Sequence, residues 1–273
     1  KVSKNIDYFY TGEIAKNIVE KVQKSENFGY LTLKDLKNYE IRKKNALCRK
    51  LKNDYLVCGP NLPSSGTICI LQALKLYENL IQKKPNLKAQ EKLDLKLSIL
   101  DFVYFLRDKH LGDDEFENVN LKDLLDNNFL LNGFKNFKKK KISRSLFNID
   151  KIFHSTSHFT LVDKYKNVLS ATSSIESSFG SRIQVNGFIL NNQLTDFRFK
   201  IKDSNNNKLK NIPKGNKRPL SSMTPLIIFD NKNDFFLTIG SPGGKAIISY
   251  IFRVLSDELY SNSNIEEIVE DPN

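Results

Sequence analysis

The residue types that could do chemistry lie in the second half of the chain, in short segments rich in hydroxyl, amide and glycine groups. Each segment borders an apolar run that is typical of a strand or a helix. A glycine pair at the start of a helix presents free backbone N–H groups, which are the donors that an oxyanion hole requires. Taken singly, each segment is also typical of an ordinary turn. The segments are Ser155-Thr156-Ser157-His158, Thr172-Ser173-Ser174, Asn191-Asn192-Gln193 with Asp196, Pro219-Leu220-Ser221-Ser222-Met223 and Gly240-Ser241-Pro242-Gly243-Gly244.

Other kinds of catalytic site find little support in the sequence. Histidine occurs only at His110, His154 and His158, and the nucleophile elbow G-x-S-x-G is absent, so a Ser/His/Asp triad is not indicated. A His-paired cysteine is equally unsupported. No C-x-x-C pair or Cys/His spacing predicts zinc, and we expect neither a metal nor a cofactor.

The formal net charge is +12, and the basic residues comprise 35 lysines and 8 arginines. Proteins that read nucleic-acid sequence rely on the bidentate fork of arginine, whereas these lysines are spread along the chain. We interpret the excess charge as a solvated lysine surface and expect no nucleic-acid partner. The dense cluster Lys138-Lys139-Lys140-Lys141 is typical of a surface loop, with an anion-binding patch as the alternative. No apolar run reaches the ~18 residues needed to span a bilayer.

The first half of the chain is predicted to be mainly helical, because its apolar residues recur with the period of a helix. Residues 115–153 are polar and poorly patterned, and no element is predicted there. The predicted helices run from a cap at Thr11 to about Lys24, from a cap at Thr32 to about Tyr39, over Ile68–Leu80 after the turn Pro63-Ser64-Ser65-Gly66, and over Ala89–His110.

The composition changes at about residue 154, where short apolar or β-branched runs begin. Such runs, bounded by Asn, Asp and Gly, are typical of strands, several of them buried on both faces. Helices followed by a strand-rich half that ends in a helix over Ala246–Leu255 indicate an α+β layered domain. The predicted strands are Phe159–Val162, Val168–Thr172, Phe188–Leu190, Leu226–Phe229 and Phe235–Ile239.

Two of the cysteines are predicted to lie opposite each other in a hairpin. A three-residue turn centred on Asn53 pairs Leu51 with Tyr55, and the same register pairs Cys48 with Cys58. Opposed strand residues can be close enough for a disulfide, which would suit an exported protein, but two reduced thiols fit the pattern equally well. Cys69 lies in an apolar run and is expected to be a buried core thiol.

Taken together and in order, these segments resemble the γ-glutamyltransferase (glutathione hydrolase) family. The resemblance extends from about Phe9 to Pro272. The segments that carry it are Phe9-Tyr10-Thr11-Gly12-Glu13-Ile14-Ala15, Leu31-Thr32-Leu33-Lys34-Asp35-Leu36, Pro63-Ser64-Ser65-Gly66, Arg107 through Leu111-Gly112-Asp113, Ser155 through Asp163, Phe179-Gly180, Leu190 through Phe197, Lys217 through Pro225, and Gly240 through Gly244.

The resemblance implies an N-terminal-nucleophile hydrolase with a four-layer αββα sandwich, here incomplete at both ends. It also implies a precursor that cuts itself at Ser155|Thr156. Residues 1–155 would then be the C-terminal part of a large subunit, and residues 156–273 the N-terminal part of a small catalytic subunit. Thr156 would be the nucleophile with its own α-amine as base, Ser174 a second hydroxyl bonded to it, and Gly243 and Gly244 the oxyanion hole.

The resemblance further implies how a γ-glutamyl group would be held. Glu176, Gln193 and Asp196 match residues that hold the α-amino group, and Ser221 and Ser222 match hydroxyls that hold the α-carboxylate. These residue types suit the task, because an ammonium prefers carboxylate and amide oxygens and a carboxylate prefers O–H and N–H donors. The family's carboxylate-binding arginine would lie upstream, and no arginine of this chain is assigned that role.

The expected activity is removal of the γ-glutamyl group from glutathione-like amides, followed by transfer to water, an amino acid or a peptide. The expected protein is a heterodimer of two subunits from one precursor, exported to the periplasm or the extracellular space by a signal peptide outside this chain. Two alternatives remain. One is a glutaryl or cephalosporin-type acylase with the same nucleophile, and the other is an inactive fragment that acts as a lysine-rich binding surface.

Overall fold

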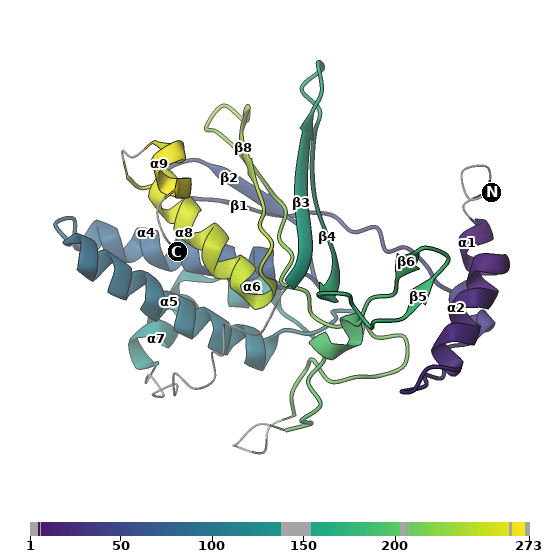
Figure 1. Cartoon of the computed structure of the whole chain (residues 1–273). Coiled ribbons are helices and arrows are strands. Elements are labelled where there is room, and N and C mark those ends of the chain that lie inside the picture. The colour runs from purple at the N-terminus through teal and green to yellow at the C-terminus, as the bar shows by residue number, and fades with distance from the viewer. Residues whose placement is uncertain are drawn as a thin grey trace. The chain divides into compact units, whose positions relative to one another are not determined.

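The structure is a computed structural model that describes residue 5 and residues 7–137, 154–202, 206, 208–261 and 264–270 (Figure 1). The chain forms two compact units, each built from segments that are far apart in the sequence. The smaller unit comprises Lys1–Lys44, Ile152–Ser155 and Ser174–Gln193, and the larger unit comprises Asn45–Lys151, Thr156–Ser173 and Leu194–Asn273.

The larger unit contains a four-stranded antiparallel sheet in the order β1-β2-β7-β8. Burial alternates along β7, as the two-residue period of a strand requires, with Leu226 and Ile228 fully buried. Both side chains belong to the core formed with the helices. The strands are β1 (Leu47–Lys50), β2 (Leu56–Gly59), β7 (Leu226–Phe229) and β8 (Phe235–Ile239).

Helices α4 (Gly66–Lys83), α5 (Ala89–His110) and α8 (Ile247–Glu258) supply most of the core of the larger unit. An ion pair joins two of them, because Nζ of the buried Lys96 donates to Oδ1 of the half-buried Asp257 at 2.5 Å. The same ammonium lies 5.5 Å from the ring centroid of Tyr77 on α4, so one side chain contacts all three helices. Shorter helices are α6 (Leu121–Leu124), α7 (Asn127–Asn136) and α9 (Ile265–Glu270).

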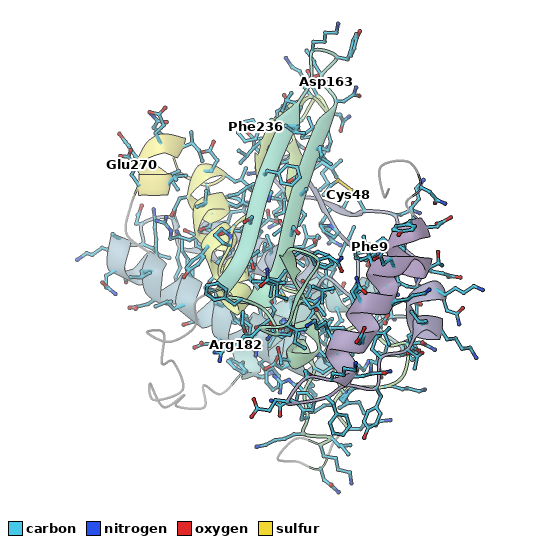
Figure 2. All side chains as sticks on the ribbon, turned by 45° about the vertical axis from the view of Figure 1, so that its right-hand side comes forward. Phe9, Cys48, Asp163, Arg182, Phe236 and Glu270 are labelled. Atoms are coloured by element: carbon cyan, nitrogen blue, oxygen red, sulfur yellow. A yellow bond between two sulfur atoms is a disulfide. The ribbon has the colours of Figure 1, made fainter. Side chains whose placement is uncertain are left out.

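Strands β3 (His154–Val162) and β4 (Val168–Ser177) pair as a long hairpin. Figure 2 shows Asp163 at its tip, where the carboxylate accepts the backbone N–H groups of Tyr165 and Asn167, each at 2.8 Å. The hairpin packs on the sheet, since Ser170 Oγ donates to the carbonyl oxygen of Leu226 at 3.4 Å (Figure 1). Helices, sheet and hairpin thus account for three successive layers of the expected αββα order, and the α+β class is confirmed.

The smaller unit combines short helices with a small sheet. Asn17 Nδ2 donates to Asn186 Oδ1 at 3.0 Å, and the rings of Phe9 and Phe188 lie 6.0 Å apart. These contacts join the start of the chain to residues far along it. The elements are α1 (Asp7–Thr11), α2 (Glu13–Gln23), α3 (Leu33–Lys37), β5 (Gln184–Val185) and β6 (Phe188–Ile189).

Several predicted elements are confirmed in place and type. Helix α5 and strands β7 and β8 have the predicted bounds. Thr32 caps α3 through a capping box, in which its side chain accepts the backbone N–H of Asp35 and the Asp35 carboxylate accepts the N–H of Thr32.

The predicted strands are not buried on both faces, since β7 alternates between buried and half-buried and β8 is exposed at its start. Two predictions about the first half of the chain are also wrong. Thr11 does not cap the long helix; it ends α1, where its Oγ1 donates to Asp7 O at 2.8 Å, and Gly12 is the residue before α2. The polar stretch 115–153 is not without elements, because α6 and α7 form in its described part. Helix α7 buries Leu130, which is 1% exposed, in the core of the larger unit.

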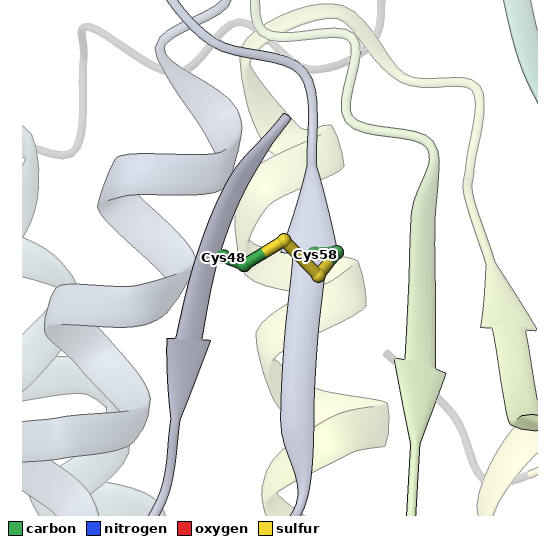
Figure 3. Close-up of a disulfide and its surroundings, with 2 residues drawn as sticks. All are labelled: Cys48 and Cys58. Atoms are coloured by element: carbon green, nitrogen blue, oxygen red, sulfur yellow. A yellow bond between two sulfur atoms is a disulfide. The ribbon is translucent and has the colours of Figure 1, made fainter. Parts of the chain in front are cut away.

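The two cysteines of the predicted hairpin form a disulfide (Figure 3). Cys48 on β1 is the register partner of Cys58 on β2, and Leu51 N donates to Tyr55 O at 2.8 Å across the turn, as the sequence predicted. Cys69 is fully buried on α4, and this burial raises the pKa of its thiol to about 12.

The lysine cluster 138–141 lies outside the described residues. Within the described part of the chain, no helix is both long enough and apolar enough to cross a bilayer.

Candidate active site

The expected nucleophile, Thr156, lies on β3 among side chains that alternate in exposure. Thr156, His158 and Thr160 are half-buried, whereas Ser157 and Phe159 between them are exposed. Successive side chains of a strand point to opposite faces, so Thr156 and His158 share the inner face of β3.

The imidazole of His158 joins the two strands of the hairpin. Its Nδ1 lies 3.0 Å from Thr172 Oγ1 on β4, and its Nε2 lies 3.3 Å from Thr160 Oγ1. Burial lowers the pKa of His158 below its usual value of 6.5, so the ring is neutral at pH 7. A neutral ring carries one donor and one acceptor nitrogen, which suits two hydroxyl partners.

The same ring packs against the glycine-rich turn. A Cβ at Gly240 would lie 2.2 Å from His158 Nδ1, a distance that real Cβ atoms essentially never show. Gly240 is therefore required where the turn approaches β3. His158 contacts both the strand of Thr156 and the turn that leads to Gly243 and Gly244.

The turn itself uses backbone conformations that favour glycine. Gly243 has φ 125° and Gly244 has φ 55°. A Cβ at Gly243 would also lie 2.8 Å from the ring of Tyr250. The turn continues into a short 3₁₀ helix, Gly244–Ala246, and then into α8.

Ser221 and Ser222 lie in a loop held by the start of α4. Ser65 donates to the carbonyl oxygen of Ser221 through both its backbone N–H and its Oγ, each at 2.7 Å. In return Ser221 N donates to Pro63 O at 3.0 Å. The predicted turn before α4 thus serves as the backbone support of the two hydroxyls.

Both hydroxyls accept a hydrogen bond from an N–H group. Met223 N donates to Ser221 Oγ at 3.1 Å, and Arg107 Nη2 donates to Ser222 Oγ at 3.2 Å. A hydroxyl that accepts in this way keeps its own proton for donation to a further partner. The pair is therefore suited to an anionic group such as a carboxylate.

Arg107 contacts the hydroxyl pair through hydrogen bonds that the sequence did not predict. Its side chain is buried, and its Nε donates to Ser65 Oγ at 2.8 Å. A signal was present in the sequence, because Arg107 follows Val103 and Leu106 on the buried face of α5. A charged side chain at a helix position where the spacing predicts an apolar one must be paired.

Asp196 lies in the larger unit, at the end of the 3₁₀ helix Gln193–Asp196. Its carbonyl oxygen accepts Asn211 Nδ2 at 2.8 Å. An open pocket of about 440 Å³ adjoins this segment and is lined largely by apolar side chains. Its lining residues are Leu194, Phe197, Phe199, Pro213, Lys214, Gly215, Asn216 and Lys217.

The smaller unit brings Ser174 and Glu176 together. Glu176 N donates to Ser174 Oγ at 2.9 Å, from a backbone with φ 73°. Asn192 donates through Nδ2 to the Glu176 carboxylate and accepts Ser177 N at 3.0 Å through Oδ1. Gln193 follows directly, and its N donates to Asn191 Oδ1 at 2.9 Å. Asn192 belongs to a segment that its residue types single out, but the sequence gives Asn192 itself no role.

The expected site residues thus fall into two groups. Ser174, Glu176 and Gln193 belong to the smaller unit, and the others to the larger unit. Among the described residues, no cluster of His, Cys, Asp and Glu has the arrangement of a metal site. The residues in the larger unit are Thr156, Asp196, Ser221, Ser222, Gly243 and Gly244.

Comparison with known proteins defines the class. The family model Gamma-glutamyltranspeptidase matches residues 2–273, which is nearly the whole chain. The chain belongs to the gamma-glutamyltranspeptidase family.

Individual relatives agree with this assignment. The glutathione hydrolase proenzyme of Bacillus subtilis (strain 168) is 34% identical, over 99% of this chain and 48% of the relative. The glutathione hydrolase proenzyme of Escherichia coli (strain K12) is 30% identical, over 97% of this chain and 47% of the relative. The chain therefore spans about half the length of the curated relatives it matches.

A solved structure supports the fold. The cephalosporin acylase from Bacillus halodurans superposes with a TM-score of 0.76 at 18% identity, over 94% of this chain and 45% of the acylase. At this identity the match concerns the fold alone, and it confirms the α+β architecture.

Proposed function

We propose that the complete protein is a γ-glutamyltransferase and glutathione hydrolase that acts through an ester on Thr156. Membership of the family and relatives named glutathione hydrolase proenzyme support this activity. The observation that carries the proposal is the direction of the hydrogen bonds at Ser221 and Ser222. Each hydroxyl oxygen accepts a hydrogen bond from an N–H group, so its own O–H can donate to an anion. Such a pair suits the α-carboxylate of a γ-glutamyl group.

In this proposal the precursor cleaves itself between Ser155 and Thr156. Residues 1–155 then belong to the large subunit and residues 156–273 to the small subunit. The cut frees the α-amine of Thr156, which has an ordinary pKa of about 7.7–8.0, so part of it is unprotonated at neutral pH. An amine in this state can take the proton from its own hydroxyl.

The reaction then follows two acyl-transfer steps. Thr156 Oγ attacks the γ-carbonyl carbon, and the backbone N–H groups of Gly243 and Gly244 stabilise the oxyanion. The amide C–N bond breaks, and the proton taken by the α-amine passes to the leaving amine. Water or the amine of an acceptor amino acid or peptide attacks the ester, gives a proton back to the base and releases Thr156. The hydroxyl of Ser174 is proposed to hydrogen-bond the nucleophile.

The α-amino group of the substrate is proposed to bind Asp196, Glu176 and Gln193. Carboxylate and amide oxygens accept from an ammonium, so this set supports a γ-glutamyl donor over a glutaryl one, which has no α-amine. The disulfide Cys48–Cys58 supports the further proposal that the protein is exported, because disulfides persist in oxidising compartments.

The test uses the complete gene, expressed as wild type and as Thr156→Ala and Thr156→Ser variants. The wild type should yield two pieces, the smaller beginning at Thr156, and should hydrolyse γ-glutamyl p-nitroanilide. Thr156→Ala should stay uncut and inactive, and Thr156→Ser, which keeps a hydroxyl, should retain processing. The proposal fails if wild type and Thr156→Ala give the same single band and equal hydrolysis. A faster reaction with glutaryl p-nitroanilide would instead favour the acylase alternative.

A further inference from the structure

The side chain of Asn211 bridges two segments of the proposed substrate site in the larger unit. It is 4% exposed, and both atoms of its amide are bonded. Its Nδ2 donates to the carbonyl oxygen of Asp196 at 2.8 Å, and its Oδ1 accepts Leu220 N at 3.1 Å. Asp196 is the proposed ammonium ligand of this unit, and Leu220 directly precedes Ser221.

The backbone around Asn211 is itself fixed. Arg198 N donates to Asn211 O at 2.7 Å, which joins the two sides of this loop. The preceding carbonyl, Lys210 O, accepts the ammonium of Lys217 at 2.5 Å, and Lys217 also donates to Glu117 Oε1 at 2.6 Å. Since Lys217 is 6% exposed, this support is buried. Asn211 therefore bridges Asp196 and Leu220 from a rigid base.

We propose that Asn211 is a positioning residue that fixes the ammonium-binding Asp196 relative to the carboxylate-binding Ser221 and Ser222. This inference rests on the function proposed above. The ammonium and carboxylate of a γ-glutamyl group sit on one carbon, so both are bound together only when their ligands are held at a matching separation. If the protein residues are already held at that separation, the carboxylate binds at little further entropic cost once the ammonium is bound. If the Asn211 bridge is loosened, this cost must be met on binding and the affinity falls.

The geometry explains why asparagine suits this position. Its amide supplies one donor and one acceptor at the end of a short side chain. Asn211→Asp keeps an acceptor for Leu220 N but places an oxygen against the Asp196 carbonyl, so the Asp196 end of the bridge is lost. Asn211→Gln keeps both groups but displaces them by one methylene.

The test measures competitive inhibition constants against γ-glutamyl p-nitroanilide, with the complete, processed protein. L-Glutamate carries both groups of the α-carbon, glutarate lacks the ammonium, and 4-aminobutanoate lacks the α-carboxylate. An inhibition constant does not depend on the fraction of enzyme that is folded, so a purely structural defect leaves it unchanged.

The expected result is that Asn211→Asp raises the inhibition constant of L-glutamate about tenfold, the size of one lost hydrogen bond. The constants of glutarate and 4-aminobutanoate should change by much less, because neither ligand uses both ends of the bridge. Asn211→Gln should show the same pattern of inhibition constants. This variant replaces Asn211→Asp in the test if Asn211→Asp yields no active protein. If neither variant yields active protein, or if all three constants change by one factor or none changes, the inference is overturned.

Asn79→Asp is the matched control. Asn79 is also buried, and its amide is bonded at both ends, to Lys75 O at 2.7 Å and to Lys52 Nζ at 2.9 Å, on α4. It should lose stability without any change in the three constants. Failure of the proposed function is distinguishable, because the wild type would then cleave no γ-glutamyl p-nitroanilide.

Discussion

Arg107 Nη2 donates to Ser222 Oγ at 3.2 Å from a guanidinium that is almost fully buried. A second nitrogen of the same guanidinium, Nε, donates to Ser65 Oγ, whose own proton is bonded to Ser221 O. One cation therefore acts on both residues of the hydroxyl pair. By donating to Ser222 Oγ, it leaves the Ser222 hydroxyl proton available for donation to another group. Through Ser65, it also holds the backbone of Ser221 in place.

Replacing Arg107 should weaken substrate binding. In Arg107→Gln the charge-assisted bond to Ser222 is lost, and such bonds contribute about 1.5–3 kcal/mol. We expect the KM of γ-glutamyl p-nitroanilide to rise by about tenfold or more, with a smaller change in kcat. Arg253→Gln is the control, because Arg253 is a half-buried arginine that donates to Ile268 O at 2.9 Å, away from the hydroxyl pair. Equal KM values in the two variants would contradict a role for Arg107 in binding.

Gly240→Ala should disable the site by displacing His158. The new Cβ would lie 2.2 Å from His158 Nδ1, so the ring or the turn must move. We expect kcat/KM to fall by at least about tenfold, because small misplacements of catalytic groups are costly. Gly215→Ala should be harmless, since nothing lies within 4 Å of a Cβ there. Partial recovery in the double variant Gly240→Ala/His158→Ala would identify the clash as the cause.

The half-buried imidazole of His158 should make the fold sensitive to acid. Its pKa in the folded protein lies below the usual 6.5, so the unfolded chain binds the proton more readily. Stability is therefore lost as the pH falls from about 6.5 through the lower pKa of the folded state. The drop in Tm between pH 7 and pH 5 should be smaller in His158→Gln than in the wild type. An identical drop would mean that other groups, among them His110, whose pKa is also lowered, account for it.

Removing the disulfide should destabilise the larger unit without exposing a reactive thiol. A cross-link between residues 10 apart in sequence contributes roughly 2–3 kcal/mol through the unfolded chain. The double variant Cys48→Ser/Cys58→Ser should unfold at lower denaturant concentration by that amount. In the native wild-type protein Cys69 should not react with a thiol reagent, because burial raises the pKa of its thiol to about 12. Of Cys48, Cys58 and Cys69, only Cys69 should become reactive on denaturation without a reductant, and labelling of Cys48 or Cys58 would contradict this pairing.

The elements that the sequence predicted are those governed by local pattern. Helix α5 contains no glycine or proline and is rich in strong helix formers, and the Cys48–Cys58 register follows from one turn. Helix α7 was missed because its Asn-rich sequence has weak intrinsic preference and depends on burial of Leu130 in the core. The polar start of β3 was missed for a similar reason, since neighbouring strands decide its conformation.

The sequence singles out the segments of the candidate site but not its hydrogen bonds. The segments around Thr156, Ser221 and Gly243 stand out by residue type, yet each alone is typical of a turn, and the roles expected of them come from the family resemblance. The donors to Ser221 and Ser222 could not, because Arg107 and Ser65 are distant in sequence and only the fold brings them together. The bridge made by Asn211 depends in the same way on long-range contacts.

The pairing of β2 with β7 has a consequence for the proposed cleavage. Cys58 on β2 precedes Ser155|Thr156 and its register partner Ile227 on β7 follows it, so the backbone hydrogen bonds of one sheet run between the two products. The products would be interlocked parts of a single core rather than two bodies that meet at a surface. Diluting the cut enzyme should therefore not separate its pieces, and the nick should be visible only after denaturation.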